Sequence, residues 1–74
     1  MRINMNLIDD RLGESPLGSF ECRRPTREQL IQEAVRYINM MIVEPIRRSQ
    51  CEWRNDVTVF GGHVNTPYGS VVFR

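Results

Sequence analysis

Residues 26–44, TREQLIQEAVRYINMMIVE, constrain the fold of this chain more than any other segment. At 100° per residue, a set of apolar side chains falls within one arc of about 140°, which is typical of an amphipathic helix. These residues are Leu30, Ile31, Ala34, Val35, Ile38, Met41 and Ile42. Thr26 is placed to cap the first turn, and Gln29 occupies the capping-box position. Pro45 has no N–H group and clashes with the preceding turn, so the helix should end near Glu44.

The apolar face of this helix must be covered, because exposing it to water would be unfavourable. We therefore expect five of its residues to be buried: Leu30, Ala34, Ile38, Met41 and Ile42. Tyr37 borders the same arc and should pack beside it. Trp53, the only tryptophan, is expected in the core or, alternatively, at an interface.

The segments on both sides of the helix have the patterns of short strands. Ile3, Met5 and Leu7 alternate with polar residues, which predicts a half-buried strand. Further strands are predicted at residues 18–23, 51–54, 57–60 and 70–73. Turns or loops are predicted at residues 9–10, 13–16 and 65–69, and the Gly61-Gly62 pair indicates a turn or a bulge.

These elements predict an α+β fold with one domain, residues 1–74. The helix, at about 26–44, should pack on a small antiparallel sheet, in the chain order β-β-α-β-β(-β), because hairpin-length connections favour antiparallel pairing. A chain of this length buries only about 60% of its unfolded surface, so its stability is marginal. Formation of a homodimer is one common way to add stability.

The sequence also predicts a cytoplasmic setting without a membrane. The start, MRINMNLIDD, lacks the apolar core of a signal peptide, and no apolar run approaches the ~20 residues needed to span a bilayer. Cys22 and Cys51 lie far apart and are interpreted as free thiols in a reducing compartment, with a disulfide between them as the alternative.

The residues for catalysis or metal binding are sparse. His63 is the only histidine and is predicted to lie on a surface loop. Cys22, Cys51 and His63 are the only candidate zinc ligands of the usual kind, but the close cysteine pair of a structural zinc site is missing. We therefore expect no catalytic, cofactor-binding or metal-binding residues and no enzymatic activity.

The arginines carry more information than these groups. All ten basic residues are arginines, and the formal net charge is +1. Arg23, Arg24 and Arg27 lie at the start of the helix, where the macrodipole is already positive, so local stability does not explain them. With the free N–H groups of the first turn, they could attract a phosphate, a carboxylate or an acidic protein surface. The alternative is a solvated cluster partly neutralised by Glu21 and Glu28.

A second candidate group lies on the side of the helix away from the apolar face. Arg36, Met40, Val43 and Arg47 fall within about 60° of one another and could form a partner-binding strip. Scattered surface hydrophobes are the alternative for Met40 and Val43. Arg47 also complements the negative end of the helix dipole, which is a structural reason for its position.

Together these features favour a small, non-enzymatic protein-binding module. We expect it to act as a regulator, inhibitor or accessory subunit, of the kind that phage and other mobile elements encode. It would engage an acidic surface of a partner protein through its arginines. The alternative is a nucleic-acid-binding protein that uses Arg23, Arg24 and Arg27 on phosphates, although the pI of 7.8 is below the value of about 9 typical of such proteins.

Overall fold

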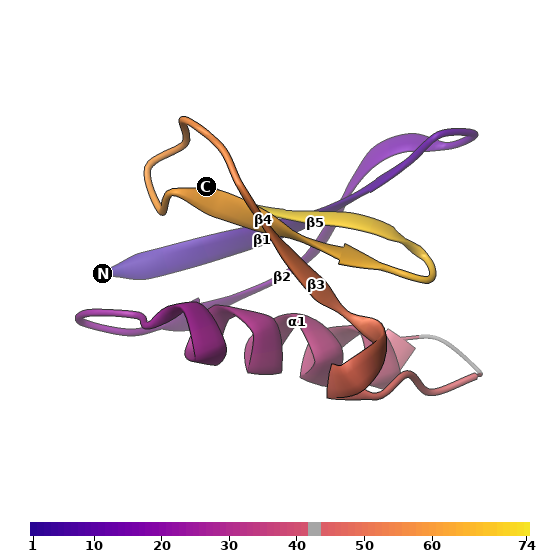
Figure 1. Ribbon diagram of the computed structural model, residues 1–74, viewed down its shortest axis with the longest axis horizontal. Helices are drawn as coiled ribbons and strands as arrows, with labels where there is room; N and C mark the ends of the chain where they lie inside the picture. The colour runs from indigo at the N-terminus through magenta and orange to yellow at the C-terminus, as the bar shows by residue number, and fades with distance from the viewer. Residues whose placement is uncertain (42–43) are drawn as a thin grey trace.

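The computed structural model describes residues 1–41 and 44–74 and has one helix packed on a five-stranded antiparallel sheet (Figure 1). The elements are β1 (Arg2–Asp9), β2 (Gly13–Glu21), α1 (Arg27–Met41), the short 3₁₀ helix η1 (Arg48–Gln50), β3 (Glu52–Asn55), β4 (Gly62–Thr66) and β5 (Gly69–Phe73). The strands lie in the order β2-β1-β5-β4-β3. The predicted α+β class, one helix on an antiparallel sheet, is confirmed, but the strands differ in detail, and β4 was not among the predicted strands.

The start of α1 is the capping box that the sequence indicates. The Gln29 backbone N–H donates to Thr26 Oγ1 at 3.1 Å, and the Thr26 backbone N–H donates to Gln29 Oε1 at 2.8 Å. Leu30, Ala34 and Ile38 are buried, as predicted. Their face of the helix packs on the sheet and forms one side of the core.

The prediction for the other end of the helix is partly wrong. Met41 was expected to be buried, but it is 63% exposed. The buried face of α1 extends only as far as Ile38 among the described residues, so the last turn projects beyond the core. Ile42, also predicted to be buried, and Val43 lie outside the described residues.

The opposite side of the core comes from alternate residues of the strands. Ile3 and Met5 of β1 and Val64 and Val71 of the central strands are fully buried, and Phe73 is nearly so. A bulge between β1 and β2 adds one residue to β2, since Met5 pairs with Gly18 whereas Asn6 pairs with Pro16. The extra residue is Leu17, which is buried. Simple alternation would point Leu17 away from the helix, and the bulge turns it into the core.

Two further segments adopt structures that the sequence did not predict. Residues 13–16 were expected to be a loop but form the first half of β2. The turn lies earlier, because Asp9 Oδ1 accepts the backbone N–H groups of Arg11 at 2.7 Å and Leu12 at 3.3 Å and closes the hairpin there. Residues 57–60 were expected to be a strand but form a loop between β3 and β4. Their β-branched composition predicted a strand, but the Asp56 side chain accepts the Thr58 N–H at 3.0 Å and starts a turn instead.

Candidate functional site

The arginines at the start of α1 are exposed and carry charge that the protein does not neutralise. Arg23 and Arg24 lie in the loop between β2 and α1, and Arg27 is the first residue of the helix. In the described part of the chain, none of the three forms a salt bridge. Five other arginines each pair with a glutamate, within 3.5 Å or less: Arg2 with Glu21, Arg36 with Glu33, Arg48 with Glu28, Arg54 with Glu52, and Arg74 with Glu14.

This pairing bears on one part of the alternative interpretation, the neutralisation of the cluster by nearby glutamates. Glu21 and Glu28 were the candidates to neutralise it, but both carboxylates are bound elsewhere. Glu21 lies against Arg2 and the N-terminal ammonium, and Glu28 accepts the Nε–H of Arg48 at 2.7 Å. The three guanidinium groups of the cluster therefore remain available to groups outside the protein.

Arg27 also contacts an aromatic ring. Its guanidinium carbon lies 5.6 Å from the centroid of the Trp53 ring, a cation–π arrangement. Trp53 lies on the edge strand β3, is half-buried and stacks on Phe73 with ring centroids 6.4 Å apart. The ring packs against the core, as expected, and the Arg27 guanidinium lies over it.

The capping box reduces the anion-binding capacity of the helix start. The sequence predicted free N–H groups there, but the Gln29 N–H already binds Thr26. Beside the first turn lies an open hollow of about 390 Å³, lined by Thr26, Arg27, Glu28, Ile31 and Arg48, in which Glu28 already pairs with Arg48. A carboxylate from outside the protein can reach the exposed Arg27 guanidinium from solvent without needing the helix N–H groups.

The second predicted group is not continuous with the first. Arg36 follows Arg27 by nine positions, or about two and a half helical turns, so the two side chains leave opposite sides of α1. Arg36 pairs with Glu33 at 3.2 Å and lies over the Tyr37 ring at 5.4 Å. Met40 is exposed, as the partner-binding strip requires.

One predicted member of the strip, Arg47, does not lie on the helix. Arg47 was placed on the same face of a continuing helix, but it lies outside α1 in an extended conformation, with φ −107° and ψ 155°. Its backbone N–H donates to Gln50 Oε1 at 2.8 Å and caps η1. Val43 lies outside the described residues. Arg36 and Met40 remain as neighbours on the outer side of α1.

The packing prediction for Tyr37 is confirmed. Its ring lies over Gly18 of β2, and its hydroxyl donates to the Ser19 carbonyl oxygen at 2.8 Å. Tyr37 thus connects the C-terminal half of α1 to the edge strand β2.

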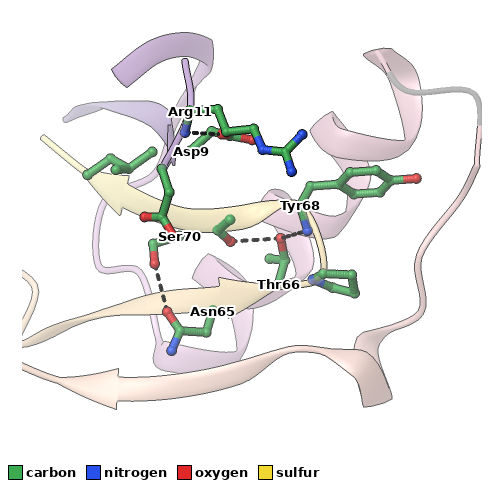
Figure 2. Close-up of a pocket in the computed structure, with 10 residues that line it drawn as sticks. Asp9, Arg11, Asn65, Thr66, Tyr68 and Ser70 are labelled. Atoms are coloured by element: carbon green, nitrogen blue, oxygen red, sulfur yellow. Dashed lines mark hydrogen bonds between the residues drawn. The ribbon is translucent and has the colours of Figure 1, made fainter. Parts of the chain in front are cut away.

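A separate hollow of about 610 Å³ lies where two hairpin turns of the sheet meet (Figure 2). It is lined by the turn between β1 and β2 and the turn between β4 and β5, and none of the predicted arginines borders it. The polar groups there bind one another, since Ser70 Oγ donates to Asn65 Oδ1 and the Tyr68 N–H donates to Thr66 Oγ1 (Figure 2). These contacts hold the turn, and the charged residues at this hollow, Asp9, Asp10 and Arg11, all come from the β1–β2 turn.

His63 was predicted to lie on a surface loop, but it belongs to β4 and is only partly exposed. Its Nδ1 lies 2.6 Å from Asp56 Oδ2, a contact hidden in the sequence because seven positions separate the two residues. Cys22 Sγ contacts Gln29 Oε1 and Cys51 Sγ contacts the Arg47 carbonyl oxygen, so the two free thiols lie in different surroundings. Among the described residues, no three His, Cys, Asp or Glu side chains are grouped as metal ligands would be.

One exposed feature was not predicted. Val57 and Val59 lie on the loop between β3 and β4, Val57 fully exposed and Val59 85% exposed. Sequence reasoning assigned both to a strand. The signal that could have found them is the Asp56-Val57-Thr58 sequence, since aspartate two residues before a threonine favours a side-chain-capped turn.

The fold and surface define a small α+β protein with an unneutralised arginine cluster. No protein-family model, curated protein or solved structure matches this chain. Within the described ranges, no helix has the length and apolar character to cross a bilayer.

Proposed function

We propose that this protein is a small, non-enzymatic protein-binding module that engages an acidic surface of a partner protein through Arg23, Arg24 and Arg27. The observation that supports it is the contrast among the arginines. Those elsewhere on the helix and sheet mostly pair with glutamates, whereas these three are exposed without a salt bridge in the described residues. Maintaining three adjacent cations at the positive end of a helix costs stability, so binding is a reason to keep them.

Arginine suits this role because its planar guanidinium binds a carboxylate through two parallel hydrogen bonds. Arg27 has an additional advantage, since the Trp53 ring restricts its side chain before binding. A restricted side chain loses less conformational freedom when the partner binds. Arg23 and Arg24, on the preceding loop, would extend the contact beyond the helix.

Nucleic acid is the alternative partner, and the distribution of aromatic side chains argues against it. Proteins that bind single strands stack bases on exposed aromatic rings. Here the aromatic residues of the strands, Phe20, Trp53 and Phe73, all belong to the core or pack against it. The capping box at the start of α1 also withdraws a helix N–H group from a phosphate.

We further infer a cytoplasmic regulator, inhibitor or accessory subunit of a phage or other mobile element. This inference rests on the small size, the free cysteines and the composition of the chain. A homodimer is compatible with the proposal, since the open edges of β2 and β3 are not paired in the sheet.

The test is a charge reversal at the cluster. The partner is first isolated from the cells that produce this protein, by affinity purification and mass spectrometry. Arg23→Glu/Arg24→Glu should then slow association and weaken binding, most clearly at low salt. Its melting temperature should stay the same or rise slightly, because acidic residues suit the start of a helix.

Arg11→Glu is the matched control, since Arg11 is also exposed and unpaired among the described residues but lies on the distant β1–β2 turn. The proposal fails if the double variant binds the partner as well as the Arg11 variant does. Retention of the wild-type protein on heparin up to high salt, lost in the double variant, would favour nucleic acid instead.

A further inference from the structure

The loop between β3 and β4 presents two valines to solvent. Val57 and Val59 flank Thr58, and both side chains are almost entirely exposed. Single exposed valines are common on protein surfaces. Two exposed valines on one short loop can do more than a single one if the loop holds them in a defined position. Such a loop has a preformed apolar tip that can enter a pocket of a partner.

Hydrogen bonds across the loop fix its conformation. The Asp56 N–H donates to the Gly61 carbonyl oxygen, and the Gly61 N–H donates to the Thr58 carbonyl oxygen, both at 3.0 Å. The Asp56 carboxylate accepts the Thr58 N–H with one oxygen and lies 2.6 Å from His63 Nδ1 with the other. The loop is therefore closed on itself and fastened to β4, which lowers the entropy cost of binding through its tip.

The loop also has an apolar attachment that connects it to the arginine cluster. Phe60 packs edge-on against Phe73 with ring centroids 6.4 Å apart, Phe73 stacks on Trp53, and Trp53 lies under Arg27. In Figure 1, this loop (orange) and the start of α1 lie at the same end of the long axis of the molecule. The valines and the cluster thus belong to one end of the protein.

We infer that Val57 and Val59 are apolar anchors of the partner-binding surface, inserting into a pocket whose rim carries the carboxylates that Arg23, Arg24 and Arg27 bind. The inference rests on the proposed function and specifies the partner chemistry, which is an apolar depression on a protein bordered by Asp or Glu. An anchor in a pocket surrounded by polar contacts is the usual arrangement of a protein interface.

Charge favours an acidic partner protein over a second copy of this chain at this surface. A symmetric dimer through this end would bring two arginine clusters together, and the like charges would repel each other. A membrane is also a poorer fit, because proteins on bilayer surfaces use larger apolar side chains such as Trp, Phe and Leu.

The first experiment places a photoreactive phenylalanine analogue at position 57 or 59, with position 12 as the control. Leu12 is 85% exposed, like Val59, but lies at the tip of the β1–β2 hairpin. Crosslinking in the cells that produce the protein, followed by mass spectrometry, should identify one protein from positions 57 and 59 and not from position 12. The crosslinked segment should contain apolar residues next to Asp or Glu.

The second experiment measures the affinity of that purified protein for variants of the valines. Val57→Ser/Val59→Ser should weaken binding by about tenfold or more, the effect of returning a buried valine to water, while Leu12→Ser leaves it unchanged. Crosslinks to a second copy or to lipid, equal crosslinking from position 12, or no crosslink at all would each overturn the inference.

The two proposals can fail separately. If Arg23→Glu/Arg24→Glu weakens binding but the valine variant binds normally, the valines are not anchors and the arginine surface stands. If the valine variant loses binding but the arginine variant does not, the proposed acidic partner surface is wrong. The inferred pocket then has no rim of carboxylates that bind the arginines.

Discussion

Arg27 and Trp53 lie on different elements, and the guanidinium carbon of Arg27 stands 5.6 Å from the centre of the Trp53 ring. The contact joins the first turn of α1 to β3, an edge strand that pairs only with β4. It gives one arginine of the cluster a fixed position while its side chain remains exposed, since long cationic side chains pack their stems and keep their charge in water.

Removing this cation should alter the environment of the indole. Trp53 is the only tryptophan, so its fluorescence reports on the contact directly. Arg27→Ala should shift the emission to longer wavelength by exposing the ring, and should reduce the free energy of unfolding by about 0.5–1 kcal/mol. Arg24→Ala, in the preceding loop, is the control and should leave the emission unchanged. Identical spectra for the two variants would show that the contact does not persist in solution.

The packing of Tyr37 over Gly18 should make this glycine intolerant of a side chain. A Cβ at position 18 would lie 2.6 Å from Cδ1 and Cε1 of the Tyr37 ring, which is closer than atoms can approach. Gly18→Ala should therefore reduce the free energy of unfolding by about 1–3 kcal/mol, measured by urea denaturation. In a Tyr37→Ala background the same substitution should cost much less. Equal costs in both backgrounds would mean that the ring is not the obstacle.

Ile38 should dominate the contribution of α1 to stability. Its side chain is fully buried between the helix and the sheet. Ile38→Ala should lower the free energy of unfolding by about 2–5 kcal/mol, because a small core cannot close the resulting cavity. Met40→Ala, two positions away on the exposed side, should change it by no more than about 0.5 kcal/mol. A reversed order of the two effects would contradict the orientation of the helix.

Acid should destabilise the β3–β4 loop through Asp56. Hydrogen bonds from Thr58 and from His63 lower the pKa of the Asp56 carboxyl below its ordinary value of 3.8. A pKa lowered in the folded state stabilises the protein above the unfolded-state pKa, and this contribution is lost as the pH falls through the folded-state value. Asp56→Asn should therefore be less stable than the wild type near neutral pH.

The difference between the two proteins should shrink below pH of about 4, which denaturation across the acid range would measure. Glu14→Gln is the comparison, because the pKa of Glu14 is also lowered, by hydrogen bonds from Arg74 and Asn6 on a different part of the sheet. The Asp56 effect should appear unchanged in the Glu14→Gln background. A difference independent of pH would show that the carboxylate charge does not hold the loop.

The elements that sequence reasoning predicted correctly depend on interactions between neighbours in the chain. The capping box of Thr26 and Gln29 joins residues three positions apart, and the apolar period of α1 follows from helix geometry alone. Two of the errors in strand assignment arose where a side chain competed with the backbone. Asp9 and Asp56 each accept backbone N–H groups and place a turn where composition alone did not.

The amino-acid sequence by itself determined that an amphipathic helix packs on an antiparallel sheet and that arginines gather at the start of this helix. Only the tertiary structure decided which of these arginines are neutralised. Glu28 pairs with Arg48 of η1 and not with its sequence neighbours Arg24 or Arg27. This contact forms because the segment after α1 brings η1 back beside the first turn of the helix. The position of Arg27 over Trp53 has the same origin, because it requires the edge strand and the helix to meet. Pairings between distant residues follow from packing of the whole core, which no local pattern encodes.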